Sequence, residues 1–135
     1  MSIELVVVTP QGEALSEQVN QVVLPGEAGD FGVLEDHERF LTPLQAGPMA
    51  IIRSSGTEWA ALSSGFAEVD GSRVVVLVDA CSVASKIDHA ETEDRRASAA
   101  DELAALADTE ENTMERSRLA AIVARAELEL DVAGR

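Results

Sequence analysis

The side chains best suited to metal chemistry lie in an acidic segment in the first third of the chain. The segment contains six side chains with oxygen or nitrogen ligand atoms: Glu27, Asp30, Glu35, Asp36, His37 and Glu38. Carboxylate oxygens suit hard cations such as Ca²⁺, but the spacing of these residues matches no EF-hand loop. We therefore expect a solvated or interface loop here, and we predict no metal site.

Residues for nucleophilic or acid–base catalysis are sparse. The two histidines, His37 and His89, lie far apart in the sequence, and Ser63-Ser64-Gly65 lacks the G-x-S-x-G pattern of a nucleophile elbow. The chain has no G-x-G-x-x-G fingerprint and no P-loop. Its single cysteine, Cys81, lies in an apolar run, which favours a buried structural thiol. The sequence predicts no catalytic residues, no cofactor and no enzymatic activity of the chain itself.

The charge balance excludes several classes of partner. The 135 residues carry 25 acidic and 10 basic side chains, a formal net charge of -15. Nucleic acids and anionic membrane surfaces would repel such a chain. The apolar runs fall far short of the roughly 20 residues that a membrane span needs. The N-terminus lacks the basic region of a signal peptide, and a lone cysteine excludes an intramolecular disulfide.

The first part of the chain, up to Lys86, has a sequence pattern typical of a β-domain. Short apolar runs with alternating or valine-rich patterns predict strands at residues 3–7, 18–24, 49–53, 58–62, 66–69 and 72–78. Two of the connections read as hairpin turns, Ser54-Ser55-Gly56-Thr57 and the two-residue link Asp70-Gly71. The four aromatic side chains are expected in the core: Phe31, Phe40, Trp59 and Phe66.

Beyond Lys86 the chain becomes rich in alanine, glutamate and arginine, without proline, phenylalanine or tryptophan. Asp88 is expected to cap a first helix that runs to about Ala107. Its apolar stripe is predicted to be Ala97, Ala100, Leu103, Ala104 and Ala107. Asn112 and Glu115 are predicted to form a capping box for a second helix, and Gly134 lies where a C-cap glycine would be. The apolar face of the second helix is predicted to be Leu119, Ile122, Val123, Ala126 and Leu130.

These patterns together predict an α+β protein. An antiparallel β-sandwich would occupy residues 1–86, and a two-helix antiparallel hairpin would occupy residues 87–135. The first helix presents mostly alanine, which buries far less apolar area than leucine. Since tertiary packing supplies most of a helix's stability, we expect a weakly held hairpin that can leave its neighbour.

Residues 24–48 carry the most specific motif of the chain. The segment reads Leu24-Pro25-Gly26, then Gly29-Asp30-Phe31-Gly32-Val33-Leu34, then His37, then Leu41-Thr42-Pro43-Leu44-Gln45-Ala46-Gly47. This density of glycine and proline predicts a chain that turns repeatedly. The motif resembles the epsilon subunit of F-type ATP synthases. Gly65-Phe66-Ala67-Glu68-Val69 and Ile87-Asp88 support the resemblance, which extends over essentially the whole chain.

The resemblance implies a non-catalytic subunit of the central stalk, on the cytoplasmic face of the bacterial inner membrane. Members of this family couple the gamma subunit to the c-ring and reach the membrane only through the complex. By position, Gly29, Asp30 and Phe31 correspond to the family's c-ring contact, and His37 corresponds to the histidine near the surface that faces gamma. The charged pairs Glu35-Asp36 and Glu38-Arg39 flank His37, where the family usually has Pro-Gly and Ala-Pro.

The resemblance also implies that the helical hairpin can reach the catalytic alpha and beta subunits and inhibit ATP hydrolysis. Arg116, Arg118 and Arg125 correspond to basic residues that can make this contact. Because residues 87–135 hold 13 acidic and 6 basic side chains, we expect weak or conditional inhibition.

Some bacterial members bind ATP through Ile/Leu-Asp-x-x-Arg-Ala. Here Glu91 takes the place of that arginine, so we expect ATP binding to be absent or weak. The alternative to the rotor function is a β-sandwich adaptor that binds another protein partner.

Overall fold

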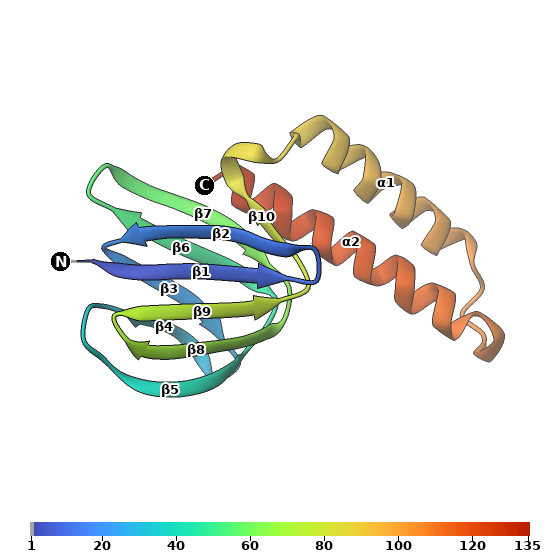
Figure 1. Ribbon diagram of the computed structural model, residues 1–135. Helices are drawn as coiled ribbons and strands as arrows, with labels where there is room; N and C mark the ends of the chain where they lie inside the picture. Colours follow the sequence, from blue (N-terminus) through green and yellow to red (C-terminus); the bar gives the residue numbers. More distant parts are fainter. Residues whose placement is uncertain (1) are drawn as a thin grey trace.

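The computed structural model describes residues 2–135, except for the side chain of His37. A ten-stranded β-sandwich is followed by two antiparallel helices (Figure 1), which confirms the predicted fold class. The strands are β1 (Ile3–Thr9), β2 (Gly12–Val19), β3 (Gln21–Gly26), β4 (Gly29–Val33), β5 (His37–Leu44), β6 (Gly47–Arg53), β7 (Gly56–Leu62), β8 (Gly65–Gly71), β9 (Arg73–Val78) and β10 (Cys81–Val83). The helices are α1 (His89–Ala105) and α2 (Thr113–Ala133), preceded by the single 3₁₀ turns η1 (Ala84–Lys86) and η2 (Glu110–Asn112).

The strands follow one hydrogen-bonded path in the order β10-β7-β6-β3-β5-β8-β9-β1-β2, and β4 pairs with β3 beside this path. All pairings are antiparallel except that of β1 with β9, which is parallel. In Figure 1 the path curls into two layers, with β1, β2, β8 and β9 nearer the viewer and β3, β4 and β6 behind. The side chains that alternate inward from both layers form one core.

The first strand shows how the pattern of the sequence produces this core. Ile3, Leu5 and Val7 are completely buried, because every second side chain of β1 points to the same face. Leu24, Ile51 and Leu62 meet them from other strands of the sandwich.

A salt bridge closes the sandwich where β2, at one end of the path, comes near β6 and β7, which lie close to the other end. Arg53 at the end of β6 donates from Nε to Oε2 of Glu17 on β2, at 2.9 Å. It also donates from Nη2 to Oε1 of Glu58 on β7, at 3.4 Å. The three side chains are each about a quarter exposed, so water screens them only in part.

The predicted strand over residues 18–24 is wrong as a single element. The structure has two strands, β2 and β3, which separate at Asn20. The break is needed because β2 pairs with β1 whereas β3 pairs with β4 and β6. The polar sequence of β2 concealed it, since only Val19 is fully buried in this edge strand.

The segment 24–48 is also more regular than predicted. It contains β4 and β5 rather than repeated turns alone. Five residues of β4 pair in register with β3, and this pairing overrides the low strand propensity of Gly29 and Gly32.

Both predicted hairpins occur, but the second is shifted by one residue. Asp70 pairs with Arg73, so the two-residue turn is Gly71-Ser72 rather than Asp70-Gly71. Gly71 takes the positive φ of +63° that this turn requires.

The first helix begins as predicted but differs in its end and its buried face. The carboxylate of Asp88 accepts from the Glu91 amide at 3.1 Å, which confirms the N-cap. The helix ends at Ala105, and its buried residues are Thr92 and Ala99. Of the predicted stripe, Ala104 and Ala107 are exposed and Leu103 is half-buried. Because alanines lie on several sides of α1, its sequence does not define one apolar face. Packing against α2 therefore decides which side of α1 is buried.

The second helix buries Leu119, Ala126, Glu129 and Val132. From the predicted face, Ile122, Val123 and Leu130 are half-buried. The predicted capping box is wrong, since Asn112 makes no side-chain cap bond; its Nδ2 donates instead to the Ala107 carbonyl at 2.9 Å. Gly134 is the C-cap as predicted, but with a right-handed φ of −88°.

Candidate functional site

The β3–β4 hairpin presents the predicted c-ring residues at its tip. Gly29 and Asp30 are exposed, whereas Phe31 is half-buried and stacks edge-on against Phe40, with ring centroids 5.5 Å apart. Gly26 has no room for a side chain, because a Cβ would lie 2.5 Å from the Gly29 carbonyl oxygen and 2.8 Å from the Phe31 ring. Gly29 itself has a φ of +130°. Phe31 therefore anchors the hairpin in the sandwich, and Asp30 is left facing solvent.

His37 is the first residue of β5 and directly follows the loop that connects β4 to β5. The side chain of His37 lies outside the described residues, and its backbone pairs with Gly71 of β8. Asp36 has a positive φ of 61° just before it. Arg39 donates to both carboxylate oxygens of Asp70, at 3.3 and 3.1 Å, in an exposed pair. The charged residues that follow the histidine are thus partly tied to β8.

A patch of exposed apolar side chains lies on β5, β8 and β9, and the sequence patterns did not predict it. The patch consists of Leu41, Pro43, Phe66 and Leu77, and is called the apolar face from here on. Phe66 pairs directly with Pro43 on one side and with Leu77 on the other. Leu41, Phe66 and Leu77 are 66%, 51% and 44% exposed. A depression of about 400 Å³ adjoins it, lined in part by Val8, Phe66 and Leu77.

The apolar face corrects the expectation that Phe66 belongs to the core. Ala67 and Val69 of β8 are completely buried. Because side chains alternate along a strand, Phe66 must then point to the opposite face. That alternation in Gly65-Phe66-Ala67-Glu68-Val69 is the signal that could have revealed the face from the sequence.

The three arginines predicted to reach other subunits lie in three different environments. Arg116 donates to the carbonyl oxygens of Leu103 and Leu106 at the end of α1, at 3.3 and 2.7 Å. Arg118 is exposed and pairs with Glu115 within α2. Arg125 is turned toward the sandwich. The structure thus leaves Arg118 as the most exposed of the three.

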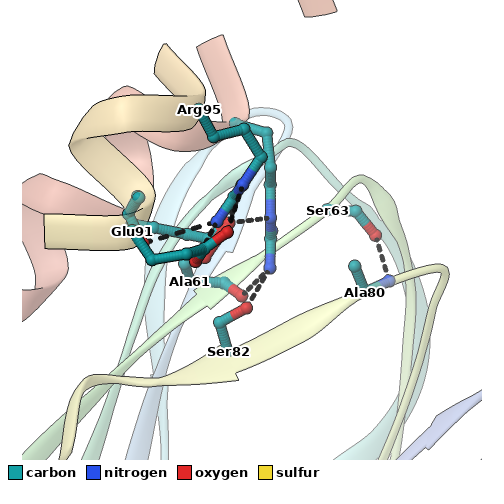
Figure 2. Close-up of polar contacts among 9 residues, drawn as sticks. Ala61, Ser63, Ala80, Ser82, Glu91 and Arg95 are labelled. Carbon is teal, nitrogen blue, oxygen red and sulfur yellow. Dashed lines mark hydrogen bonds and ion pairs between the residues drawn. The ribbon is translucent and has the colours of Figure 1, made fainter. Parts of the chain in front are cut away.

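Arg125 joins α2 to the sandwich through Ala61 and Ser82, which Figure 2 labels. Its Nη2 donates to the Ala61 carbonyl oxygen at 3.1 Å and to Ser82 Oγ at 2.8 Å. Its Nε lies 3.4 Å from Oε1 of Glu129.

A cavity of about 340 Å³ lies between β10, the start of α1 and α2, at the segment that resembles an ATP motif. Its lining includes Asp88, Glu91, Arg95 and Glu129. Arg95 pairs with Glu91 at 3.4 Å and with Glu129 at 3.2 Å. Hydrogen bonds to Glu91 and then to Glu129 raise the pKa of Arg95 above its usual value. Of the two cations that line the cavity, Lys86 and Arg95, Arg95 is therefore already paired with carboxylates of the chain.

Two other side chains near this cavity have structural roles. Cys81 lines it, and burial raises the pKa of its thiol, so the thiolate is disfavoured. Ser63 lies outside the lining, and in Figure 2 its hydroxyl oxygen is joined to the Ala80 amide. Its Oγ accepts from the amides of Asp79 and Ala80, at 2.9 and 3.0 Å, and so ties two neighbouring turns together.

Among the side chains that the structure describes, no three His, Cys, Asp or Glu residues gather as metal ligands. Over residues 2–135, neither helix combines the length and the apolar character needed to cross a membrane.

A family model described as the β-sandwich domain of the ATP synthase delta/epsilon chain matches residues 2–84. The ATP synthase epsilon chain of Anaeromyxobacter sp. (strain K) is 36% identical over 135 residues, which cover 100% of both chains. The epsilon chain of Helicobacter acinonychis is 46% identical over 77 residues, which are 57% of this chain and 63% of that protein.

Two solved structures share the fold. One chain of the Euglena gracilis mitochondrial ATP synthase (OSCP/F1/c-ring) aligns with a TM-score of 0.64 and 20% identity, covering 98% of this chain and 78% of that one. One chain of the Tetrahymena thermophila mitochondrial ATP synthase central stalk/c-ring aligns with a TM-score of 0.56 and 15% identity, covering 98% and 97%. With the sandwich matched by the family model and full-length relatives at 36% identity, the chain belongs to the ATP synthase delta/epsilon family, as an epsilon subunit.

Proposed function

We propose that the chain is a non-catalytic rotor subunit in the central stalk of a proton-translocating F-type ATP synthase. It would couple the gamma subunit to the c-ring during ATP synthesis. It would lie at the cytoplasmic face of the bacterial inner membrane and be held there only by the complex. Family membership supports this proposal, and the observation that carries it is the apolar face, because exposed neighbouring apolar side chains mark a surface that a partner covers.

The apolar face is the proposed docking surface for gamma. Phe66 is its central side chain, with Pro43 and Leu77 opposite it on the neighbouring strands. The helical hairpin contacts β6, β7 and η1, so it leaves this face open. A large aromatic at the centre of an interface typically carries much of the binding energy. His37, at the start of β5, is proposed as a further contact with gamma.

Binding of purified gamma to a Phe66→Asp variant tests this surface. We expect affinity to fall by about tenfold or more, because a charge would be desolvated at the centre of the contact. Met114→Asp on α2 is the matched control, since Met114 is 86% exposed and lies outside the apolar face. Equal binding by the two variants would contradict the proposal.

The tip of the β3–β4 hairpin is the proposed contact with polar loops of the c-ring. Gly29 and Asp30 are its exposed members, and Phe31 holds the hairpin in place. An Asp30→Lys variant should weaken ATP-driven proton pumping in reconstituted vesicles. Glu13→Lys, the same reversal at an exposed position of β2, should not. The same pumping rate in both variants would argue against this contact.

The helical hairpin is proposed to inhibit ATP hydrolysis weakly or conditionally through Arg116, Arg118 and Arg125. Two observations favour a weak effect: Arg116 and Arg125 are engaged inside the chain, and the hairpin is net acidic. ATPase activity of the complex with and without the residues after Lys86 measures the effect. A small rise on truncation is expected, and a large rise would contradict the proposal.

We further propose that ATP binds weakly or not at all beside Asp88. Glu91 and Glu129 already pair with Arg95, so a phosphate would have to displace a carboxylate and face the other one. Titration calorimetry of the chain with ATP and Mg²⁺ should show no saturable heat at micromolar concentrations. Tight saturable binding would overturn this.

A further inference from the structure

One guanidinium makes the main polar connection between the helical hairpin and the sandwich. Arg125 of α2 reaches Ala61 of β7 and Ser82 of β10, which are direct partners in the β7–β10 ladder. Figure 2 labels both acceptors, Ala61 and Ser82, which lie side by side on neighbouring strands. The Arg125 side chain is therefore hydrogen-bonded to two paired strands at once.

A carboxylate holds this guanidinium in position. Glu129 is only 8% exposed and lies between Arg125 Nε at 3.4 Å and Arg95 Nη1 at 3.2 Å. A buried carboxylate needs such cationic partners to offset its desolvation. Because Arg95 belongs to α1, the same carboxylate joins both helices to the arginine that reaches the sandwich.

The apolar packing around this connection is thin. The fully buried apolar side chains of the hairpin are Ala99, Leu119, Ala126 and Val132. A second polar contact lies at the chain end, where the Arg135 guanidinium stands 4.4 Å from the centre of the Trp59 ring on β7. This is the distance of a cation–π contact. The polar contacts of Arg125 and Arg135 thus join the hairpin to the sandwich beside this apolar packing.

We propose that Arg125 is a latch that holds the helical hairpin against the β-sandwich, with Arg135 on Trp59 as a second fastening. The latch uses only groups of this chain, so docking requires no bound ligand. Release breaks the two hydrogen bonds to Ala61 and Ser82 while the pairing with Glu129 stays within α2.

The latch has a consequence for inhibition that rests on the proposed function. Arg125 is also one of the residues proposed to contact the catalytic subunits. The same guanidinium is bonded to β7 and β10 in the docked hairpin, so docking and that contact exclude each other.

The chain carries its own probe for this inference. Trp59 is the only tryptophan, is half-buried and lies under Arg135. In an Arg125→Gln variant of the full chain, release of the hairpin should shift Trp59 emission to longer wavelength and increase quenching by acrylamide. Arg118→Gln is the matched control, because it removes the same charge from α2 at an exposed residue that pairs with Glu115 of the same helix. Unchanged emission and quenching in Arg125→Gln would overturn the latch.

A gentler variant separates release from loss of the fold. Ser82→Ala removes only the hydroxyl acceptor on β10, and it should change Trp59 quenching in the same direction by a smaller amount. Far-UV circular dichroism confirms that the strands remain. If Arg125→Gln unfolds the whole chain, the result for Ser82→Ala decides. Trp59 quenching in Ser82→Ala equal to that of the unmodified chain would then overturn the proposal. Both measurements use the chain alone, so a failure to bind gamma would leave their outcome unaffected.

Discussion

At the scale of single residues, the arginine that closes the sandwich is the clearest case of a charge with a structural role. Arg53 joins Glu17 on one edge strand to Glu58 on β7. The hydrogen bond from Arg53 lowers the pKa of Glu17 below its usual value. A carboxyl with a lowered folded-state pKa stabilises the fold above its unfolded-state pKa, and this contribution is lost as pH falls through the folded-state pKa.

A Glu17→Gln variant should therefore be less stable than the unmodified chain by about 1 kcal/mol near neutral pH. The difference should shrink as pH falls below about 4, where the unfolded state takes up the proton that the folded state resists. Urea unfolding of both chains across this range measures it. Glu13→Gln, at an exposed position of the same strand, serves as control. A difference independent of pH would contradict the assigned role of the pair.

Gly65 is required by close approach rather than by its dihedral angles. A Cβ at this position would overlap the carbonyl oxygen of Leu77 on β9. Since a backbone atom cannot move aside cheaply, Gly65→Ala should cost about 1–3 kcal/mol of stability. Gly134→Ala is the control, because the nearest atoms there are 3.6 and 3.7 Å away. Thermal unfolding that shows equal midpoints for the two variants would refute this explanation.

At the scale of elements, α2 completes the end of α1. The last carbonyls of a helix lack partners within it, and Arg116 donates to those of Leu103 and Leu106. An Arg116→Ala variant should fray α1, seen as faster amide exchange near residue 105 with little change at its start. Arg118→Ala should leave this exchange unaltered. Faster exchange along the whole of both helices in Arg116→Ala would instead indicate that the residue holds the hairpin together.

Sequence patterns predicted some of the strands and helices but not all of them. Alternation predicted β1 correctly, and the change in composition predicted the helices, because both signals are local. The strands β4 and β5 were missed because their glycines and prolines disfavour a strand, whereas pairing with β3 and β8 imposes one. The buried face of α1 was misjudged because alanines surround the helix, so only contact with α2 selects the covered side.

At the scale of the whole molecule, the sandwich has a core of its own. Every residue of the main hydrophobic cluster lies between Ile3 and Val83. A chain ending at Lys86 should therefore keep a cooperative unfolding transition and its β-sheet circular dichroism. Loss of that transition would show that the hairpin is part of one folding unit with the sandwich.

The candidate site was predictable only in part, because several of its residues are distant from one another in the sequence. The motif in residues 24–48 identified the family, and the exposure of Asp30 agrees with its position at the hairpin tip. The apolar face was not predicted, since it gathers side chains from β5, β8 and β9 that are distant in the sequence. The partners of Arg125 lie 64 and 43 residues away, so no local pattern could reveal them.

The most direct test of the account is to purify the tagged chain from native membranes in mild detergent and to count the subunits that accompany it. We predict one copy per complex, together with gamma, the catalytic subunits and the c-ring, and loss of this association in the Phe66→Asp variant. Recovery of the chain alone, or with an unrelated partner, would contradict the rotor function and would leave an adaptor built on the same fold.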